Sequence, residues 1–111
     1  MGAIINAKVA FELTGEPILA RAIIGLDLVV IIHASATHPI PLERGRTYQL
    51  ALELRGGAGC KVSMKFLDED DKALAIDVIS KKGAKTSSDN LTCTTTGTLW
   101  HDTKAAEMTV P

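Results

Sequence analysis

The chain has 111 residues, of which 46% are hydrophobic and 23% charged, as in an ordinary globular domain and unlike a disordered chain. Lysine and arginine number 12 against 13 acidic residues, and a net charge of −1 argues against a protein held to nucleic acid by phosphate contacts. Aromatic residues make up only 4%, too few for a base-stacking platform.

A chain of this length forms one domain, residues 1–111, and is long enough to bury a hydrophobic core. Its first eight residues lack the basic segment and apolar run of a signal peptide. The most apolar stretch, residues 18–36, contains Arg21, Asp27 and His33, and charges near the centre of a membrane span are costly. We therefore expect core strands there and no contact with a membrane.

The first half of the chain has a period of two. Residues 5–13 alternate apolar and polar side chains, which predicts a half-buried strand, and the turn residues 14–17 end it. Residues 18–24 suit either a strand or a helix, and Gly25 interrupts them. Residues 26–34 are rich in Val and Ile, which predicts a short buried strand.

Residues 35–46 are expected to form a loop, because Pro39 and Pro41 exclude a central strand. The next two segments alternate most cleanly. Residues 48–55 predict a strand whose inward side chains are Tyr48, Leu50, Leu52 and Leu54. Residues 60–67 predict another, with Val62, Met64 and Phe66 inward.

The connections in the second half are rich in Gly and Asp. Residues 56–59 predict a hairpin connection, and 68–72 a tight acidic turn. Further expected segments are a strand at 73–79, a loop at 81–90, a strand at 91–96 and a last segment from 99 to 110. Seven or eight short strands with no long amphipathic helix predict an all-β sandwich or barrel.

The two cysteines, Cys60 and Cys93, are too few for a disulfide-dense secreted domain and are not clustered like zinc ligands. We expect two reduced, largely buried thiols, with a disulfide between them as the alternative. The single tryptophan, Trp100, is expected in the sandwich core, with an exposed sugar or partner contact as the alternative.

No pattern predicts catalysis, a metal site or a cofactor. The acidic run 68–71 lacks the spacing of a calcium loop, so a solvated turn is expected. His101 and Asp102 are neighbours on one strand and point to opposite faces, which makes a poor catalytic dyad. The glycines at 56–59 precede a strand and not a helix, so they do not form a phosphate loop. We expect a protein that is not an enzyme.

Residues 40–56 resemble the turn and alternating strand of jelly-roll carbohydrate-binding-module-like domains. Residues 62–72 are similar to the hairpin that follows in those domains, with Asp71 where glycine is usual, and 100–111 are similar to their closing segment. The resemblance implies an antiparallel β-sandwich of jelly-roll type. Residues 1–39 do not share it, and the sugar-stacking aromatic residues have no clear counterparts.

Over its whole length the chain resembles the small capsid decoration, or cement, proteins of short-tailed bacteriophages. The resemblance lies in its size, its apolar β-rich first third and its jelly-roll-like second half. It implies a non-enzymatic protein that is made in the host cytoplasm and binds the outer surface of the virion capsid. There it clamps neighbouring subunits of the major capsid protein, as a homodimer at local two-fold positions.

The first 39 residues carry few charges, which also indicates a dimer or partner interface. The candidate contact residues are Ile4, Ile5 and Phe11 in the first strand and the segment 37–42, with Thr37, His38, Pro39 and Ile40. The alternative is that these side chains complete the core.

Two other functions stay open. A carbohydrate-binding module predicts that Trp100 and Tyr48 are exposed and line one groove. A small phage enzyme or inhibitor is disfavoured, because no His, Cys and carboxylate residues form a recognisable motif.

Overall fold

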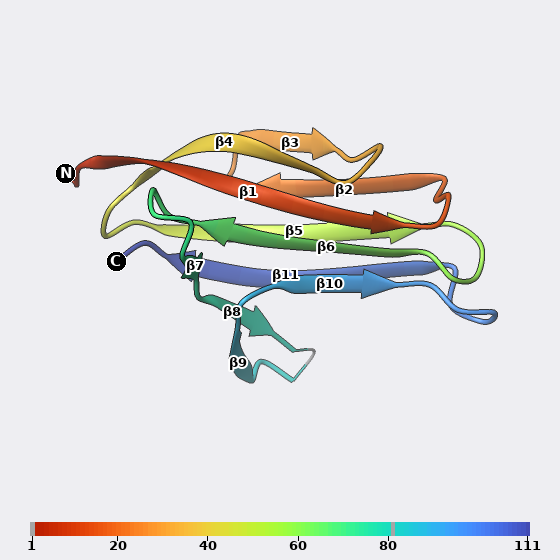
Figure 1. Cartoon of the computed structure of the whole chain (residues 1–111). Helices are drawn as coiled ribbons and strands as arrows, with labels where there is room; N and C mark the ends of the chain where they lie inside the picture. Colours follow the sequence, from red (N-terminus) through yellow and green to blue (C-terminus); the bar gives the residue numbers. More distant parts are fainter. Residues whose placement is uncertain (1, 81) are drawn as a thin grey trace.

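The computed structural model describes residues 2–80 and 82–111, and all the regular elements in these residues are β-strands. The described residues form eleven strands, more than the seven or eight expected, and every pair is antiparallel. They form two sheets that lie one over the other (Figure 1). In the described residues, no helix has the length and apolar character needed to cross a membrane.

The smaller sheet has five strands in the order β10-β6-β1-β4, with β7 also paired to β6. Its strands are β1 (Ile4–Thr14), β4 (Ala36–Glu43), β6 (Lys61–Leu67), β7 (Ala73–Leu74) and β10 (Leu91–Thr94).

The larger sheet has six strands in the order β3-β2-β5-β11-β8-β9. Its strands are β2 (Leu19–Ile24), β3 (Leu28–Ile31), β5 (Thr47–Arg55), β8 (Ile76–Ile79), β9 (Lys85–Ser88) and β11 (His101–Thr109). Both β3 and β4 are edge strands, and they lie along the same side of the sandwich (Figure 1).

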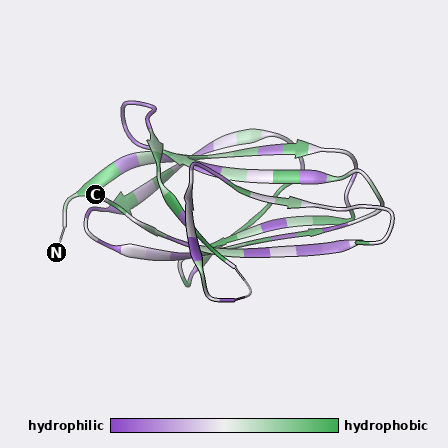
Figure 2. Ribbon diagram, turned by 90° about the horizontal axis from the view of Figure 1, so that it is seen from below, coloured by the Kyte–Doolittle hydropathy of each residue, from purple (hydrophilic) through white to green (hydrophobic). Residues whose placement is uncertain are grey.

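The core lies between the sheets and follows from the alternation in the sequence. Hydrophilic and hydrophobic residues alternate along the longer strands in Figure 2, so these strands turn one set of apolar side chains inward. The inward positions expected in 48–55 and 60–67 are confirmed: Leu50, Leu52, Leu54, Val62, Met64 and Phe66 are buried. Tyr48 is only half-buried, at the end of its strand.

Two predictions about the first half of the chain are wrong in part. The expected buried strand at 26–34 is the edge strand β3, and Leu28, Val29 and Ile31 are exposed. The expected loop at 35–46 contains the strand β4, although the prolines do exclude a central position, since β4 is an edge strand. The ambiguous segment 18–24 is the strand β2.

The second half also differs from expectation in its connections. Residues 56–59 do not form a hairpin, because β5 and β6 belong to different sheets. The segment 73–79 forms two short strands, β7 and β8, in different sheets. The expected loop 81–90 contains β9, and its first residue lies outside the described residues. Alternation shows which face of a strand is buried, but not which strand lies beside it.

Cys60 and Cys93 are both free and buried, as expected. Burial raises the pKa of the Cys93 thiol to about 12. Since the thiolate is the reactive form, Cys93 stays protonated at pH 8. Mass spectrometry after brief iodoacetamide treatment should find Cys93 unmodified in the native protein and modified in urea. Rapid labelling of Cys93 in the native state would contradict this.

Candidate interaction face

The outer faces of the two sheets differ in chemistry. On the five-stranded sheet the outward residues are mostly polar or charged, among them Lys8, Glu12, Ser63 and Lys65. On the six-stranded sheet the outward positions include a continuous line of apolar side chains. Because an exposed apolar patch is typical of interaction sites, the outer face of the six-stranded sheet is the candidate contact surface.

The apolar line follows directly from the strand register. Ile23 lies opposite both Val29 and Ala51, Ala51 opposite Ala105, and Ala105 opposite Ile79. We call Val29, Ile23, Ala51, Ala105 and Ile79 the apolar row. Its members are exposed or half-buried, and it spans five of the six strands. Two of its members, Ala51 and Ala105, have small side chains and lie side by side on β5 and β11.

One flank of the apolar row carries a charged cluster centred on Glu53. Arg21 Nη2 lies 2.7 Å from Glu53 Oε1, and His101 Nε2 lies 2.8 Å from Glu53 Oε2. The hydrogen bond to His101 lowers the pKa of Glu53, and the charge of Arg21 adds to this effect against the opposing influence of burial. A hollow of about 140 Å³ opens between this cluster and the apolar row.

The lowered pKa of Glu53 has a consequence for stability. Its carboxylate favours the folded state above the ordinary pKa of 4.5, and this contribution is lost as the pH falls through the lower folded value. Replacing Glu53 with glutamine should cost about 1 kcal/mol at pH 7, or about 4 °C in Tm. The difference from the wild-type Tm should vanish well below pH 4.5. A difference that persists unchanged in acid would contradict this, as measured by thermal unfolding at several pH values.

The other flank is also polar. Glu107 pairs with Lys85 and accepts a hydrogen bond of 3.2 Å from Gln49, and Asp77 accepts one of 2.8 Å from Ser87. An apolar centre between two polar borders is the usual composition of a protein interface.

Exposed large hydrophobic side chains gather at the β3 end of this face. Of the eight in the described residues, five lie between positions 18 and 31: Ile18, Leu26, Leu28, Val29 and Ile31. Leu26 is the most exposed, at 89%. Clustered exposure of this kind marks an interaction site more strongly than single apolar residues do.

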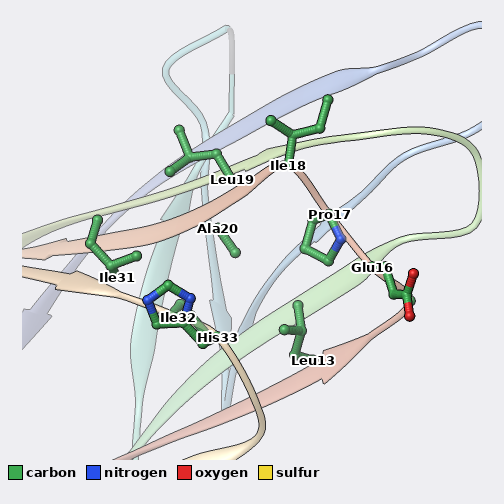
Figure 3. Close-up of a pocket in the computed structure, with 10 residues that line it drawn as sticks. Leu13, Glu16, Pro17, Ile18, Leu19, Ala20, Ile31, Ile32 and His33 are labelled. Atoms are coloured by element: carbon green, nitrogen blue, oxygen red, sulfur yellow. The ribbon is translucent and has the colours of Figure 1, made fainter.

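A cavity lies at each end of β3. The larger, of about 250 Å³, is lined by residues from the end of β1, the turn after it, the start of β2 and the end of β3. Figure 3 shows Leu13, Pro17, Ile31 and His33 around it. The second, of about 190 Å³, lies between β3 and β4, with Leu28 on one side and Ile40 and Leu42 on the other.

The structure divides the predicted contact residues into two groups. Ile5, Phe11 and Ile40 are buried in the core and are not available to a partner. The prediction that they contact a partner is therefore corrected: they complete the core. Ile4, Thr37, His38 and Pro39 are exposed. The three exposed residues of β4 lie on the same side of the sandwich as β3, whose contact potential the sequence reasoning missed.

Trp100 is 64% exposed, which corrects its expected place in the core. It precedes β11, beside the end of β5 where Arg55 pairs with His101, and Tyr48 lies at the opposite end of the same strand pair. Arg46 covers the Tyr48 ring, and the Tyr48 hydroxyl accepts a hydrogen bond from the Glu43 amide. The two aromatic side chains therefore do not line one groove.

The remaining candidates behave as solvated or structural groups. Asp102 accepts a hydrogen bond from the Thr94 amide while His101 contacts Glu53, so the two neighbours do serve opposite faces. Asp68 accepts hydrogen bonds from the amides of Asp70 and Lys72, which builds the acidic turn. Across residues 2–80 and 82–111, no three His, Cys, Asp or Glu side chains gather as metal ligands.

The apolar row was missed because its members come from five separate strands. Ile23, Ala51 and Ala105 carry no local signal, and only the pairing of β2, β5 and β11 brings them together. One feature of the sequence could have indicated an interaction site at β3, namely the run of aliphatic residues beside Leu26. A buried strand has the same pattern, so the sequence alone does not distinguish the two.

Comparison with known proteins identifies no relative. No protein-family model matches the chain, and searches of curated proteins and of solved structures find no match.

Proposed function

We propose that this protein is a non-enzymatic decoration protein that binds the outside of a phage capsid and clamps neighbouring subunits of the major capsid protein. The observation that carries the proposal is the apolar row, bordered on both flanks by polar clusters on the six-stranded sheet. The resemblance of the sequence to phage decoration proteins supports it. The protein acts on the virion surface as a homodimer at local two-fold positions, with the fold a jelly-roll variant of the β-sandwich.

The shape and charge of the protein suit this role. A flat face lies across the seam between two subunits without needing a deep pocket on either one. Each contact is modest, but many copies on one shell resist its expansion together. A net charge of −1 keeps long-range repulsion between closely spaced copies small.

A carbohydrate-binding module is the second candidate, and the exposure of Trp100 favours it. The separation of Trp100 from Tyr48 removes the two-aromatic groove that this function predicts. Saturable binding on a glycan array that is lost in the Trp100→Ala variant would support this candidate.

Co-sedimentation tests the decoration function. Purified protein is mixed with capsid shells that lack it and, separately, with unassembled capsid subunits. We expect saturable binding to the shells and little binding to the subunits, because a clamp needs two neighbouring subunits in place. Failure to bind shells, or equal binding to subunits, would overturn the proposal.

A further inference from the structure

We propose that two copies of this chain pair through their β3 edges, antiparallel and centred on Val30, so that the two six-stranded sheets join into one. This inference deepens the proposed homodimer by identifying its interface. The biological role of the pairing rests on the proposed function, but the pairing itself needs no capsid.

The first argument is that β3 is an unprotected edge of the six-stranded sheet. Free edges invite pairing with other chains, and proteins blunt them with proline, charge or covering side chains. The edge β3 consists of Leu28, Val29, Val30 and Ile31, with no charge and no proline. The opposite edge of the same sheet, β9, is polar along its whole length, from Lys85 to Ser88.

The neighbouring edge strand β4, by contrast, is protected against pairing with another strand. The Arg44 amide donates a hydrogen bond to the Ala3 carbonyl. In β4, therefore, the backbone N–H and C=O groups of residues 36, 38, 40 and 42 point toward β1. Those of the residues between them point away from the sheet, toward its free edge. The outward set is Thr37, Pro39, Pro41 and Glu43. The two prolines have no N–H, and the Glu43 amide already donates to the Tyr48 hydroxyl at 2.9 Å.

The same reasoning leaves β3 open. The Ile32 amide donates a hydrogen bond to the Ala20 carbonyl, so the backbone N–H and C=O groups of residues 28, 30 and 32 point toward β2. The backbone groups of residues 29 and 31 point away from β2, toward the free edge of the sheet. In the described part of the chain, the amides of Val29 and Ile31 have no hydrogen-bond partner. Two donors and two acceptors on an aliphatic strand form a ready template for a further strand.

A second copy of β3 fits this template. With Val30 opposite the partner's Val30, Val29 lies opposite the partner's Ile31, so the outward amides and carbonyls of both copies meet in hydrogen-bonded pairs. Opposed residues also share a face, since Val29 and Ile31 both lie on the outer face of the sheet. A shift of one residue would oppose outer and inner side chains.

The register also matches hydrogen-bonding side chains and shape. It places Asp27 beside the partner's His33, at both ends of the pair. Both side chains are exposed, and neither makes a hydrogen bond or ion pair within the described residues. It also brings Leu26, 89% exposed, to the end of the partner strand where the 250 Å³ cavity opens.

The joined sheets have both apolar rows on one side, because the two-fold axis is perpendicular to the sheet. The dimer therefore presents a single contact face of twice the width, suited to a two-fold seam. An interface made mainly by one pair of short strands is small among protein interfaces. We therefore expect a dissociation constant of about 10 µM for the dimer.

Sedimentation equilibrium of the protein alone, without capsid, tests the pairing. The Val29→Pro variant removes an outward amide and leaves the hydrogen bonds to β2 in place, and it should raise the dissociation constant at least about tenfold. Val29→Thr keeps the amide and the branched side chain, and it is the matched control that should dimerise like the wild type. Thermal unfolding of each variant shows that it is folded.

Charge exchange tests the register with exposed residues that do not affect folding. Asp27→Lys and His33→Glu should each weaken the dimer by about fivefold through like or unmatched charges, and the double variant should restore it. A wild-type protein that stays monomeric, or a Val29→Pro variant that dimerises normally, would overturn the pairing. A double variant no better than the single ones would overturn the register. A monomer that still co-sediments with shells would leave the decoration function standing and remove only this interface.

Discussion

Replacing Phe66 with alanine should lower the free energy of unfolding by about 3–5 kcal/mol, the largest effect on stability that we expect in this chain. Phe66 is fully buried between the sheets, on β6, where it lies opposite Val9 on one side and Leu74 on the other. Removal of the ring leaves a cavity that neighbouring strands cannot close. Urea unfolding followed by circular dichroism measures the change.

The adjacent residue provides the matched control. Lys65 is exposed on the same strand, with its side chain on the opposite face. Lys65→Ala should change the free energy of unfolding by no more than about 0.5 kcal/mol. Equal effects at the two positions would contradict the register of β6 and the placement of the core.

Replacing Ala105 with arginine should weaken binding to capsid shells by about 100-fold, which corresponds to about 2.7 kcal/mol. Ala105 lies in the middle of the apolar row and is exposed, so the variant should fold normally. An arginine there would hold the partner off the flat face and bury an unpaired charge. Co-sedimentation over a range of protein concentrations measures the affinity.

The same substitution on the other sheet is the control. Ala10 occupies the outer face of the five-stranded sheet, opposite Lys65 and Thr37. Ala10→Arg should bind shells like the wild type if the six-stranded sheet forms the contact. Loss of binding in Ala10→Arg with full binding in Ala105→Arg would move the contact to the opposite face.

The core was predictable because it depends on local alternation. Leu50, Leu52 and Leu54 occupy every second position of one strand, and a strand of that pattern has one apolar face wherever it lies. The prolines of β4 showed in the same way that the segment is not central, although not that it is a strand.

The contact face was not predictable, because it depends on which strands are neighbours. The aliphatic run of β3 is typical of a buried strand, and only its place at the end of the strand order leaves it exposed. The exposure of Trp100 has a similar cause, since it lies in the connection before β11 and not in a strand. Pairing between residues far apart in sequence decides both cases.

The melting temperature of capsid shells that lack this protein, followed as the protein is added, tests most directly whether it clamps the shell. A ligand that binds only the intact shell stabilises it by about 2.7 kcal/mol at a hundredfold excess over Kd. The shell Tm should therefore rise as protein is added, and Ala105→Arg should need about 100-fold more protein for the same rise. A shell Tm that stays constant at saturating protein would contradict the proposed function.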